Sequence, residues 1–180
     1  MCNKDEDTVA VKSVLAGNTA AFAGIVERWQ SPLVNLAYRF CRDSSRAEDM
    51  AQEAFLRAYR KLETFRGEAS FSTWLFALAT NVYRDEVRRV TPTLVAFNAE
   101  TDGSSAPGAE YNAEQADQQR LVQTALLSLP EKYRVPLLLF YFHEQNVAET
   151  AATLNLPVGT VKARLSRGRK QLAAKLEQRL

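Results

Sequence analysis

The sequence predicts an all-α protein made of two small helical domains. Apolar residues recur at spacings of three and four in both halves of the chain, as they do in amphipathic helices. No stretch alternates with period two, so we expect no sheet. The segment 91–112 collects Pro, Gly, Ser, Thr and acidic residues, which end helices and populate loops. A structureless stretch of about 20 residues is unusual inside one compact domain, so we expect a first domain at 1–92, a flexible acidic linker at 93–115 and a second domain at 116–180.

The first long helix is expected over the stretch AAFAGIVERWQSPLVNLAYRF, which begins at Ala20. Pro32 lies in its middle and suggests a boundary or a kink, because proline removes a helical hydrogen bond. The side chains that should face the core are Phe22, Ile25, Val26, Trp29, Leu33, Leu36, Ala37 and Phe40.

Two more helices should complete the first domain. Ser45 lies three residues before Glu48, the spacing of a capping box, so a helix is expected to begin there. Another should run from about Ser70 or Phe71 to Arg89. The apolar stripe of the earlier helix is Met50, Ala51, Ala54, Phe55, Ala58, Tyr59 and Leu62, and that of the later one is Trp74, Leu75, Leu78, Ala79 and Val82.

The second domain should open with two helices. The stretch QADQQRLVQTALLSL ends before Pro130, which is well placed to begin the next helix with Ser128 or Leu129 as its cap. Pro136 could still fall within the first turns of that helix, which tolerate proline better than a helix interior does, but we expect a boundary there. The apolar stripe of the first of these helices is Leu121, Val122, Ala125, Leu126 and Leu129.

The stretch VAETAATLNLPVGTVKARLSRGRKQL, from Val147 to Leu172, predicts a helix-turn-helix. Ala151 is a small residue where a second helix must approach closely, and Asn155 suits the left-handed backbone of such a turn. Leu156 and Val158 should fill the angle between the helices. The buried stripe of the second helix is expected to be Val161, Leu165, Leu172 and Leu176.

With that stripe facing inward, the 100° step of a helix places a cationic face outward. A charged face is usually only a solvated face, but here the small residue, the turn residue and the apolar stripe occur at mutually consistent spacings. Such a helix fits the DNA major groove, where Arg and Lys donate to guanine and to phosphates. The residues expected to contact DNA are Thr160, Lys162, Ala163, Arg164, Ser166, Arg167, Arg169 and Lys170.

Composition narrows the class of protein. The net charge of +2 hides a regional split, with +1 over 1–93, −5 over 94–119 and +6 over 120–180. No apolar run is long enough to span a membrane, and the N-terminus lacks the pattern of a secretory signal, so we expect no membrane insertion and a cytoplasmic location. Cys2 and Cys41 form no motif for a disulfide or a metal, and His143 is the only histidine. We therefore expect no metal and no cofactor.

Motifs in both halves resemble those of the extracytoplasmic-function (ECF) group of bacterial RNA polymerase sigma factors, members of the sigma-70 family. The pattern D-x-x-Q-E-x-F-L-R-A-Y occurs at 49–59, F-R-G-E-A-S-F at 65–71 and T-W-L at 73–75. These are similar to region 2 of that family. The stretches LPEKYRVPLLLFYF and LPVGTVKARLSRGRKQL are similar to region 4.

The resemblance implies a sigma factor that directs core polymerase to promoters and initiates transcription, under control of an anti-sigma factor and in a stress or envelope response. Region 4 would bind the minus-thirty-five element and the flap of the polymerase β subunit. Region 2 would bind the clamp helices of the largest subunit. That docking is carried over to Asp49, Gln52, Glu53, Leu56 and Arg57, although Glu53 and Arg57 could instead be an exposed i,i+4 pair.

The resemblance also implies that region 2 captures the melted minus-ten strand. An unstacked base needs aromatic walls and polar partners, and a basic helix face can follow phosphates. Trp74 lies in an apolar stripe and is expected in the core. The residues carried over to this role are Phe65, Gly67, Ser70, Phe71, Ser72, Asn81, Arg84 and Arg88.

Some positions depart from the family pattern. His143, Glu144 and Gln145 replace the usual Glu-Gly-Leu, Thr150 occupies an apolar position and Asn155 replaces a turn glycine.

A stand-alone regulator that binds duplex DNA as a dimer would use the same helix-turn-helix. An enzyme would need converging carboxylates, histidines or metal ligands, for which the sequence gives little support, so neither catalytic residues nor a small-molecule substrate is expected.

Overall fold

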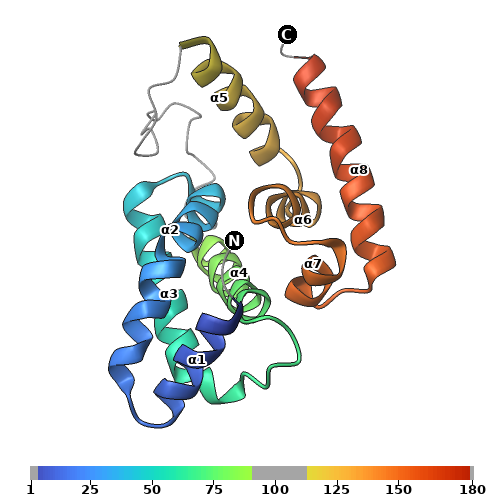
Figure 1. Ribbon diagram of the computed structural model, residues 1–180. Helices are drawn as coiled ribbons and strands as arrows, with labels where there is room; N and C mark the ends of the chain where they lie inside the picture. The colour runs from blue at the N-terminus through green and yellow to red at the C-terminus, as the bar shows by residue number, and fades with distance from the viewer. Residues whose placement is uncertain (1–3, 91–112, 179–180) are drawn as a thin grey trace. The chain divides into compact units, whose positions relative to one another are not determined.

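The computed structural model describes residues 4–90 and 113–178, and every regular element in these ranges is a helix (Figure 1). The prediction of a flexible linker at 93–115 lies outside them, except that residues 113–115 already belong to a helix. The described helices form two compact units: α1 to α4 make up the first, and α5, α6, α8 and most of α7 the second. The α-helices are α1 (Lys4–Leu15), α2 (Phe22–Cys41), α3 (Ser44–Arg60), α4 (Phe71–Val90), α5 (Ala113–Leu127), α6 (Glu131–Phe142), α7 (Val147–Leu154) and α8 (Val158–Glu177), and two short 3-10 turns lie at Thr19–Ala21 and Leu62–Thr64.

In the first unit, α2 packs along α3, and both pack against α4. The expected stripes supply most of this core. Contrary to expectation, α2 continues through Pro32 without a boundary. Trp29, Leu33 and Leu36 on either side of the proline are buried, so tertiary packing holds together a helix that lacks one hydrogen bond.

The start of α3 also differs from the prediction. The helix begins at Ser44, and its N-cap is Asp43, whose side chain accepts a hydrogen bond from the backbone N–H of Arg46 at 2.9 Å. Ser45 is therefore inside the first turn, and no capping box forms with Glu48. Arg42 adopts a left-handed backbone, with φ of 60°, between α2 and α3. Asp43 can cap because it directly follows that reversal.

A buried carboxylate ties α1 to α2. Asp7 is only 2% exposed. It accepts a hydrogen bond from the indole Nε1 of Trp29 at 3.2 Å, and it pairs with Nε of Arg28 at 3.0 Å. Such a buried charge is tolerated only because its partners replace water. The pair therefore fixes the position of α1 on the bundle.

The second unit is organised around α6, which packs against α8, while α5 also contacts α8. The expected boundary at Pro136 is wrong, because α6 runs unbroken from Glu131 to Phe142 and buries Pro136 in the core. The N-cap is Pro130. The guanidinium of Arg134 donates to the carbonyl oxygen of Leu127 at 3.0 Å, and its burial lowers its pKa.

The approach of α6 to α8 depends on Gly168, which is buried within the basic part of α8. A Cβ atom at this position would lie 3.0 Å from Cδ1 of Leu137 and 3.3 Å from Cβ of Tyr133. A residue with a side chain would therefore require Leu137 and Tyr133 to shift by a few tenths of an ångström. On α5, Ala125 and Leu126 are buried as expected, but Val122 is exposed.

Candidate nucleic-acid interface

α7 and α8 form the predicted helix-turn-helix. Asn146 precedes α7, and its side chain accepts a hydrogen bond from the backbone N–H of Glu149, whose carboxylate in turn accepts one from the N–H of Asn146, both at 2.9 Å. Such reciprocal capping sets where the helix starts. The turn contains Asn155 with φ of 51°, which confirms the left-handed backbone expected there. Val158 is 44% exposed and does not fill the angle between the helices, contrary to expectation.

The two sides of α8 differ as the periodicity predicts. Val161 and Leu165 are buried, and Gly168 continues this side one turn later, whereas Leu172 and Leu176 are only half-buried. The side chains predicted to contact DNA lie away from this stripe. Thr160 and Arg164 are half-buried, and the exposed ones are Lys162, Ala163, Ser166, Arg167, Arg169 and Lys170.

α8 is strongly basic. The helix carries six basic residues and one acid. Over the described residues, the ion pairs join other side chains and none involves a cation of α8. Arg169 on this face has a neutral partner, because its Nη1 donates to the hydroxyl of Tyr141 at 3.3 Å. The face therefore presents positive charge to whatever binds it.

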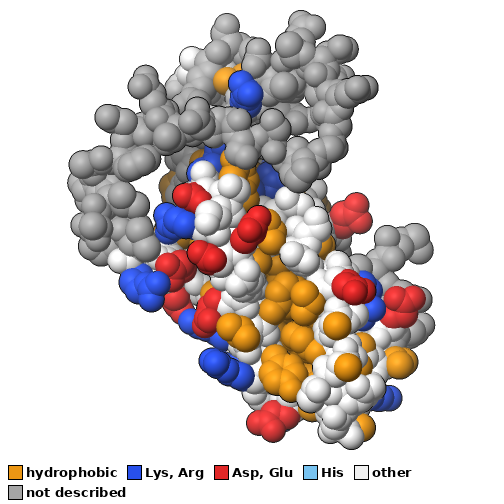
Figure 2. Space-filling view, turned by 90° about the vertical axis from the view of Figure 1, so that its left-hand side faces the viewer, with side chains coloured by type: hydrophobic (Ala, Val, Ile, Leu, Met, Phe, Trp, Pro, Cys, Tyr) orange, Lys and Arg blue, Asp and Glu red, His pale blue; other side chains and the backbone are white. Residues whose placement is uncertain are grey.

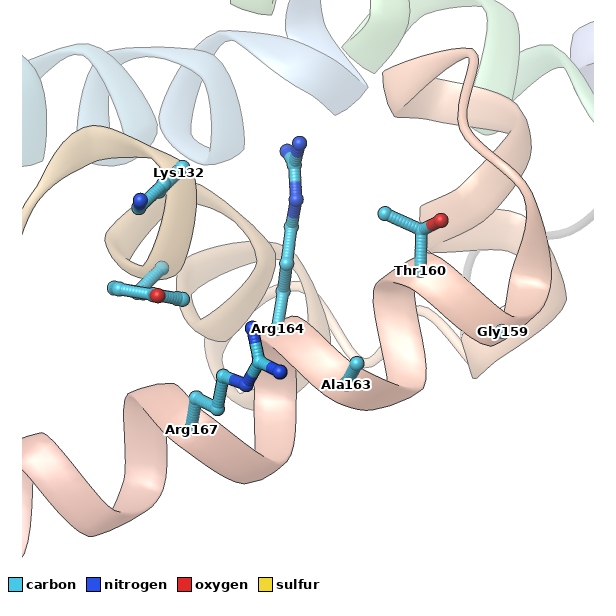
Figure 3. Close-up of a pocket in the computed structure, with 7 residues that line it drawn as sticks. Lys132, Gly159, Thr160, Ala163, Arg164 and Arg167 are labelled. Carbon is cyan, nitrogen blue, oxygen red and sulfur yellow. The ribbon is translucent and has the colours of Figure 1, made fainter.

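Part of this face borders an open hollow of about 430 Å³ between α8 and the start of α6 (Figure 3). From α8 it brings together Thr160, Ala163, Arg164 and Arg167, four of the predicted residues, with Gly159. Figure 3 shows Lys132 on α6 across the hollow from the long side chain of Arg164. Three of the lining residues, Lys132, Tyr133 and Gly159, are not among those that the sequence predicts to contact DNA.

A second candidate site lies at the start of α4, where three aromatic rings cluster. The ring centroid of Phe65 is 5.5 Å from that of Phe71 and 5.7 Å from that of Trp74, and Phe71 and Trp74 are 5.6 Å apart. Phe71 is 4% exposed, so it supports the other two rings and cannot be the exposed pocket wall that was expected. Trp74 was expected in the core, yet it is half-buried like Phe65. The rings available to a base are thus Phe65 and Trp74.

The polar residues of this loop divide into structural and exposed groups. Ser70 accepts a hydrogen bond from the backbone N–H of Thr73 at 3.2 Å, which makes it a cap for α4. Its hydroxyl also lies 2.9 Å from that of Ser72. Gly67 has φ of 75°, a conformation that favours glycine, and faces open space. The cap orients the loop that carries Phe65.

Farther along α4, the predicted phosphate contacts lie on one face. Asn81 and Arg88 are exposed and Arg84 is half-buried, at spacings of three and four that place them on successive turns. Arg89, at the end of α4, pairs through its guanidinium with Glu86 at 2.9 Å. The side chains of this face could follow a nucleic-acid backbone leading away from the aromatic rings.

The expected polymerase contacts lie on the outer side of α3. Asp49 and Gln52 are exposed, and Leu56 is 52% exposed. Glu53 and Arg57 do form the i,i+4 pair, at 2.6 Å, and Arg57 also lies 3.8 Å from Asp85. Figure 2 shows apolar side chains gathered on the side of the molecule where α2 and α3 lie, with acidic and basic ones beside them. This pattern fits a protein interface with a polar rim.

A shallow groove adjoins that surface. It runs between α2 and α3, and Gln52, one of the predicted residues, is part of it. Val26 was expected in the core but lines this groove instead, so the apolar stripe of α2 is wider than the core requires. The full lining is Val26, Gln30, Val34, Glu48, Ala51, Gln52 and Phe55.

None of the helices described at 4–90 and 113–178 is long and apolar enough to cross a membrane. Within the same ranges, no three side chains of His, Cys, Asp or Glu come together as a metal site. Burial raises the pKa of the Cys41 thiol. That shift keeps the thiol protonated and poorly reactive.

Comparisons with known proteins bear on both units. The family described as Sigma-70 region 2 matches residues 25–93, and the one described as Sigma-70, region 4 matches residues 119–172. The chain is 38% identical to the ECF RNA polymerase sigma factor SigW of Bacillus subtilis, over 92% of this chain and 94% of that protein. It is 31% identical to the ECF RNA polymerase sigma-E factor of Escherichia coli K12, over 95% of this chain and 94% of the other.

Solved structures agree on the fold. CnrH, solved in complex with the cytosolic domain of CnrY, matches with a TM-score of 0.73 at 25% identity, over 98% of this chain and 99% of that one. The sigma factor RpoE of Bartonella quintana, solved with the anti-sigma factor NepR, matches with a TM-score of 0.69 at 22% identity, over 87% and 96%. The chain belongs to the ECF group of RNA polymerase sigma factors.

Proposed function

We propose that this sigma factor directs core RNA polymerase to promoters through two separate DNA contacts, one by α8 and one by the start of α4. The observation that carries the proposal is the solvent-facing cationic side of α8, which no described carboxylate neutralises. A helix of this kind fits the major groove, where a bidentate Arg contact discriminates one base by about 1–3 kcal/mol. In a sigma factor the sequence bound there is the minus-thirty-five element.

Within the α8 face we separate two kinds of contact. The exposed Ser166, Arg167 and Lys170 lie on the side opposite Val161 and Leu165, and we propose that they approach the base edges. Phosphate contacts position a protein on the duplex without reading its sequence. Ala163 lies on the same side as these three and would face the groove with them, whereas Thr160, Lys162, Arg164 and Arg169 flank that line and would contact the backbone or the groove walls.

The second contact captures a base of the melted minus-ten strand. Phe65 and Trp74 offer partly exposed rings, and stacking a base on an aromatic ring is worth about 1–3 kcal/mol. Gly67 lies in the loop before α4 and Ser72 in the first turn of α4, and Asn81, Arg84 and Arg88 would follow the strand along α4. Ser70 and Phe71 act indirectly, one by capping α4 and the other by supporting the rings.

The partners of the protein are proposed on the same basis. The outer side of α3, with Asp49, Gln52, Glu53, Leu56 and Arg57, would dock on the clamp helices of the largest polymerase subunit, and the second unit would bind the flap of the β subunit. RpoE of Bartonella quintana was solved with an anti-sigma factor. We propose that an anti-sigma factor likewise holds this chain inactive until a stress or envelope signal arrives.

The proposal also covers the activity, the location and the domain boundaries of the protein. The protein acts as an initiation factor and catalyses no reaction of its own, because promoter choice needs only binding. It acts in the cytoplasm, where polymerase and DNA are found. Its functional domains correspond to residues 1–92 and 116–180, with the acidic segment 93–115 between them. A stand-alone regulator is not favoured, because that class accounts only for the second unit.

Run-off transcription with purified core polymerase on a promoter library tests the proposal. The wild type should select promoters with a defined upstream element and start site. Arg167→Ala should lose preference within the upstream element, whereas Phe65→Ala should bind promoters but open them poorly, as potassium permanganate footprinting would detect. If the wild type does not direct core polymerase to any start site, the proposed function is wrong. A palindromic duplex bound tightly without polymerase would instead indicate the stand-alone regulator.

A further inference from the structure

The hollow between α6 and α8 contains two residues to which neither the sequence motifs nor the proposed function gives a role, Lys132 and Tyr133. We propose that this hollow is a seat for one backbone phosphate of the duplex whose bases α8 reads. The inference rests on the proposed function of α8 and adds to it a contact from a different helix. The phosphate seat is defined by Lys132, Tyr133, Gly159, Thr160, Ala163, Arg164 and Arg167.

Charge identifies the ligand as an anion. Among the seven lining residues, three are cationic and none is acidic. Glu131 precedes Lys132 in the chain but does not line the hollow; its carboxylate acts on Arg134 instead, where it partly offsets the lowering of the pKa by burial. Tyr133 and Thr160 add hydroxyl groups. Because Arg167 is proposed to read bases, the charged groups left for a phosphate are the guanidinium of Arg164 and the ammonium of Lys132, and a phosphate accepts charge-assisted hydrogen bonds from both.

Shape shows that the ligand can enter. Gly159 and Ala163 lack long side chains, and a Cβ atom built on Gly159 would meet nothing within 4 Å. The ammonium group of Lys132 lies 5.1 Å from the centroid of the Tyr133 ring, close enough for a cation–π interaction that holds it at the edge of the hollow. The bottom of the hollow is thus lined by small residues, and the charged groups lie around its opening.

Placement links the seat to base reading. Thr160, Ala163, Arg164 and Arg167 occur at i, i+3, i+4 and i+7, so they form one line along α8, and Arg167 ends that line beside Ser166 and Lys170. Lys132 reaches the line from α6. The close packing of α6 on Gly168 fixes the distance between the two helices. A phosphate held between them would therefore strengthen the hold of α8 on the duplex without adding to the reading of its sequence.

The test uses holoenzyme assembled with the full chain and a promoter duplex carrying a single neutral methylphosphonate at each upstream position in turn. In the wild type, one position should weaken binding by roughly tenfold, as expected for loss of a charged hydrogen bond. Lys132→Gln should weaken binding to the unmodified duplex by a similar factor. In this variant, the methylphosphonate at that one position should cause almost no further loss of affinity. The slope of log affinity against log salt concentration should also be smaller for Lys132→Gln than for the wild type, by the amount expected for about one phosphate contact.

Matched variants distinguish a specific phosphate contact of Lys132 from a general effect of positive charge on DNA binding. Lys175→Gln removes one positive charge from the last turn of α8, outside the seat, and should leave the methylphosphonate profile unchanged. Lys132→Arg should restore most of the affinity, because the charge is kept. Lys132→Gln should not change which base pairs are preferred, since a phosphate contact carries no sequence information.

The proposal is overturned if Lys132→Gln and the wild type respond equally to every methylphosphonate, or if Lys132→Gln changes base preference. A titration with inorganic phosphate at constant ionic strength covers the other source of the same chemistry. Lys132-dependent binding of inorganic phosphate, with no coupling on DNA, would assign the seat to a free anion and would also overturn the proposal. Failure of the proposed function is distinct, because then wild-type holoenzyme would show no upstream preference at all.

Discussion

Charged side chains of the first unit are paired with one another, whereas the cations of α8 face outward without ion-pair partners among the described residues. In the first unit, Asp7 is buried against Arg28 and Trp29, Arg57 contacts both Glu53 and Asp85, and Glu86 pairs with Arg89. On α8, five cations fall between positions 162 and 170, and no ion pair of the described residues includes them. The difference teaches that the first unit should respond to substitution mainly through stability, and α8 mainly through binding.

The largest effect is expected from Phe71→Ala. Truncation of a buried Phe costs about 3–5 kcal/mol, because it removes apolar burial and leaves a cavity beneath Phe65 and Trp74. Both tryptophans of the chain, Trp29 and Trp74, lie in the first unit, so tryptophan fluorescence during urea unfolding follows that unit. Arg167→Ala is the control and should change the unfolding curve little. Equal stability of Phe71→Ala and wild type would contradict the supporting role of this ring.

Asp7→Ala should come next, with a loss of about 2–3 kcal/mol. The substitution leaves the buried N–H of Trp29 without its acceptor and removes the carboxylate beside Arg28. Asp7→Asn keeps an oxygen for the indole and should lose less. The same fluorescence assay measures both. If the two substitutions were equally harmful, the charge alone would matter and the hydrogen bond to Trp29 would not.

A smaller effect is expected at two glycines of α8. Alanine in place of glycine usually stabilises a helix by up to about 1 kcal/mol. Gly159→Ala should show part of that gain, since its Cβ meets nothing, whereas Gly168→Ala should show none or a loss because of the contact with Tyr133. Hydrogen exchange of peptides from α6 and α8 measures the difference. A gain at Gly168 matching that at Gly159 would mean that the helices separate without cost.

The smallest effect on stability is expected from Glu53→Gln. The Glu53–Arg57 pair is about 40% exposed on each side, and exposed helix pairs contribute only about 0.3–0.5 kcal/mol. Binding to core polymerase should weaken more visibly than stability, because the pair lies beside the exposed Leu56. Fluorescence anisotropy with core enzyme measures this. Should affinity stay unchanged while stability falls, the pair has only a structural role.

The periodic parts of the sequence predicted the fold well because burial depends on spacing. Val161 and Leu165 were predicted in the core of α8 from period alone, and Asn155 was predicted in the turn from its tolerance of positive φ. Boundaries expected at prolines did not occur, because tertiary packing overrode them: α2 continues through Pro32, and α6 continues through Pro136. Asp43 and Ser45 are both good caps two residues apart, and only the backbone reversal at Arg42 decides between them.

The candidate sites were harder to predict than the helices. Phe71 and Trp74 both lie at the start of α4, and sequence alone could not show which ring is covered and which is half-exposed. Lys132 joins the phosphate seat only through the packing of α6 on α8, which no local pattern encodes. One signal was available: Gly168 lies seven residues after Val161, on the buried side of a basic helix, which indicates a close partner at that point.

The most direct test of the account is a measurement of holoenzyme affinity for promoters in which each base pair of the upstream element is substituted in turn, with wild type and Arg167→Ala compared. The account predicts that the wild type loses about 1–3 kcal/mol at one or more positions and that Arg167→Ala becomes indifferent at a subset of them. An identical pattern of base preference in both proteins would contradict the claim that the exposed face of α8 reads the promoter.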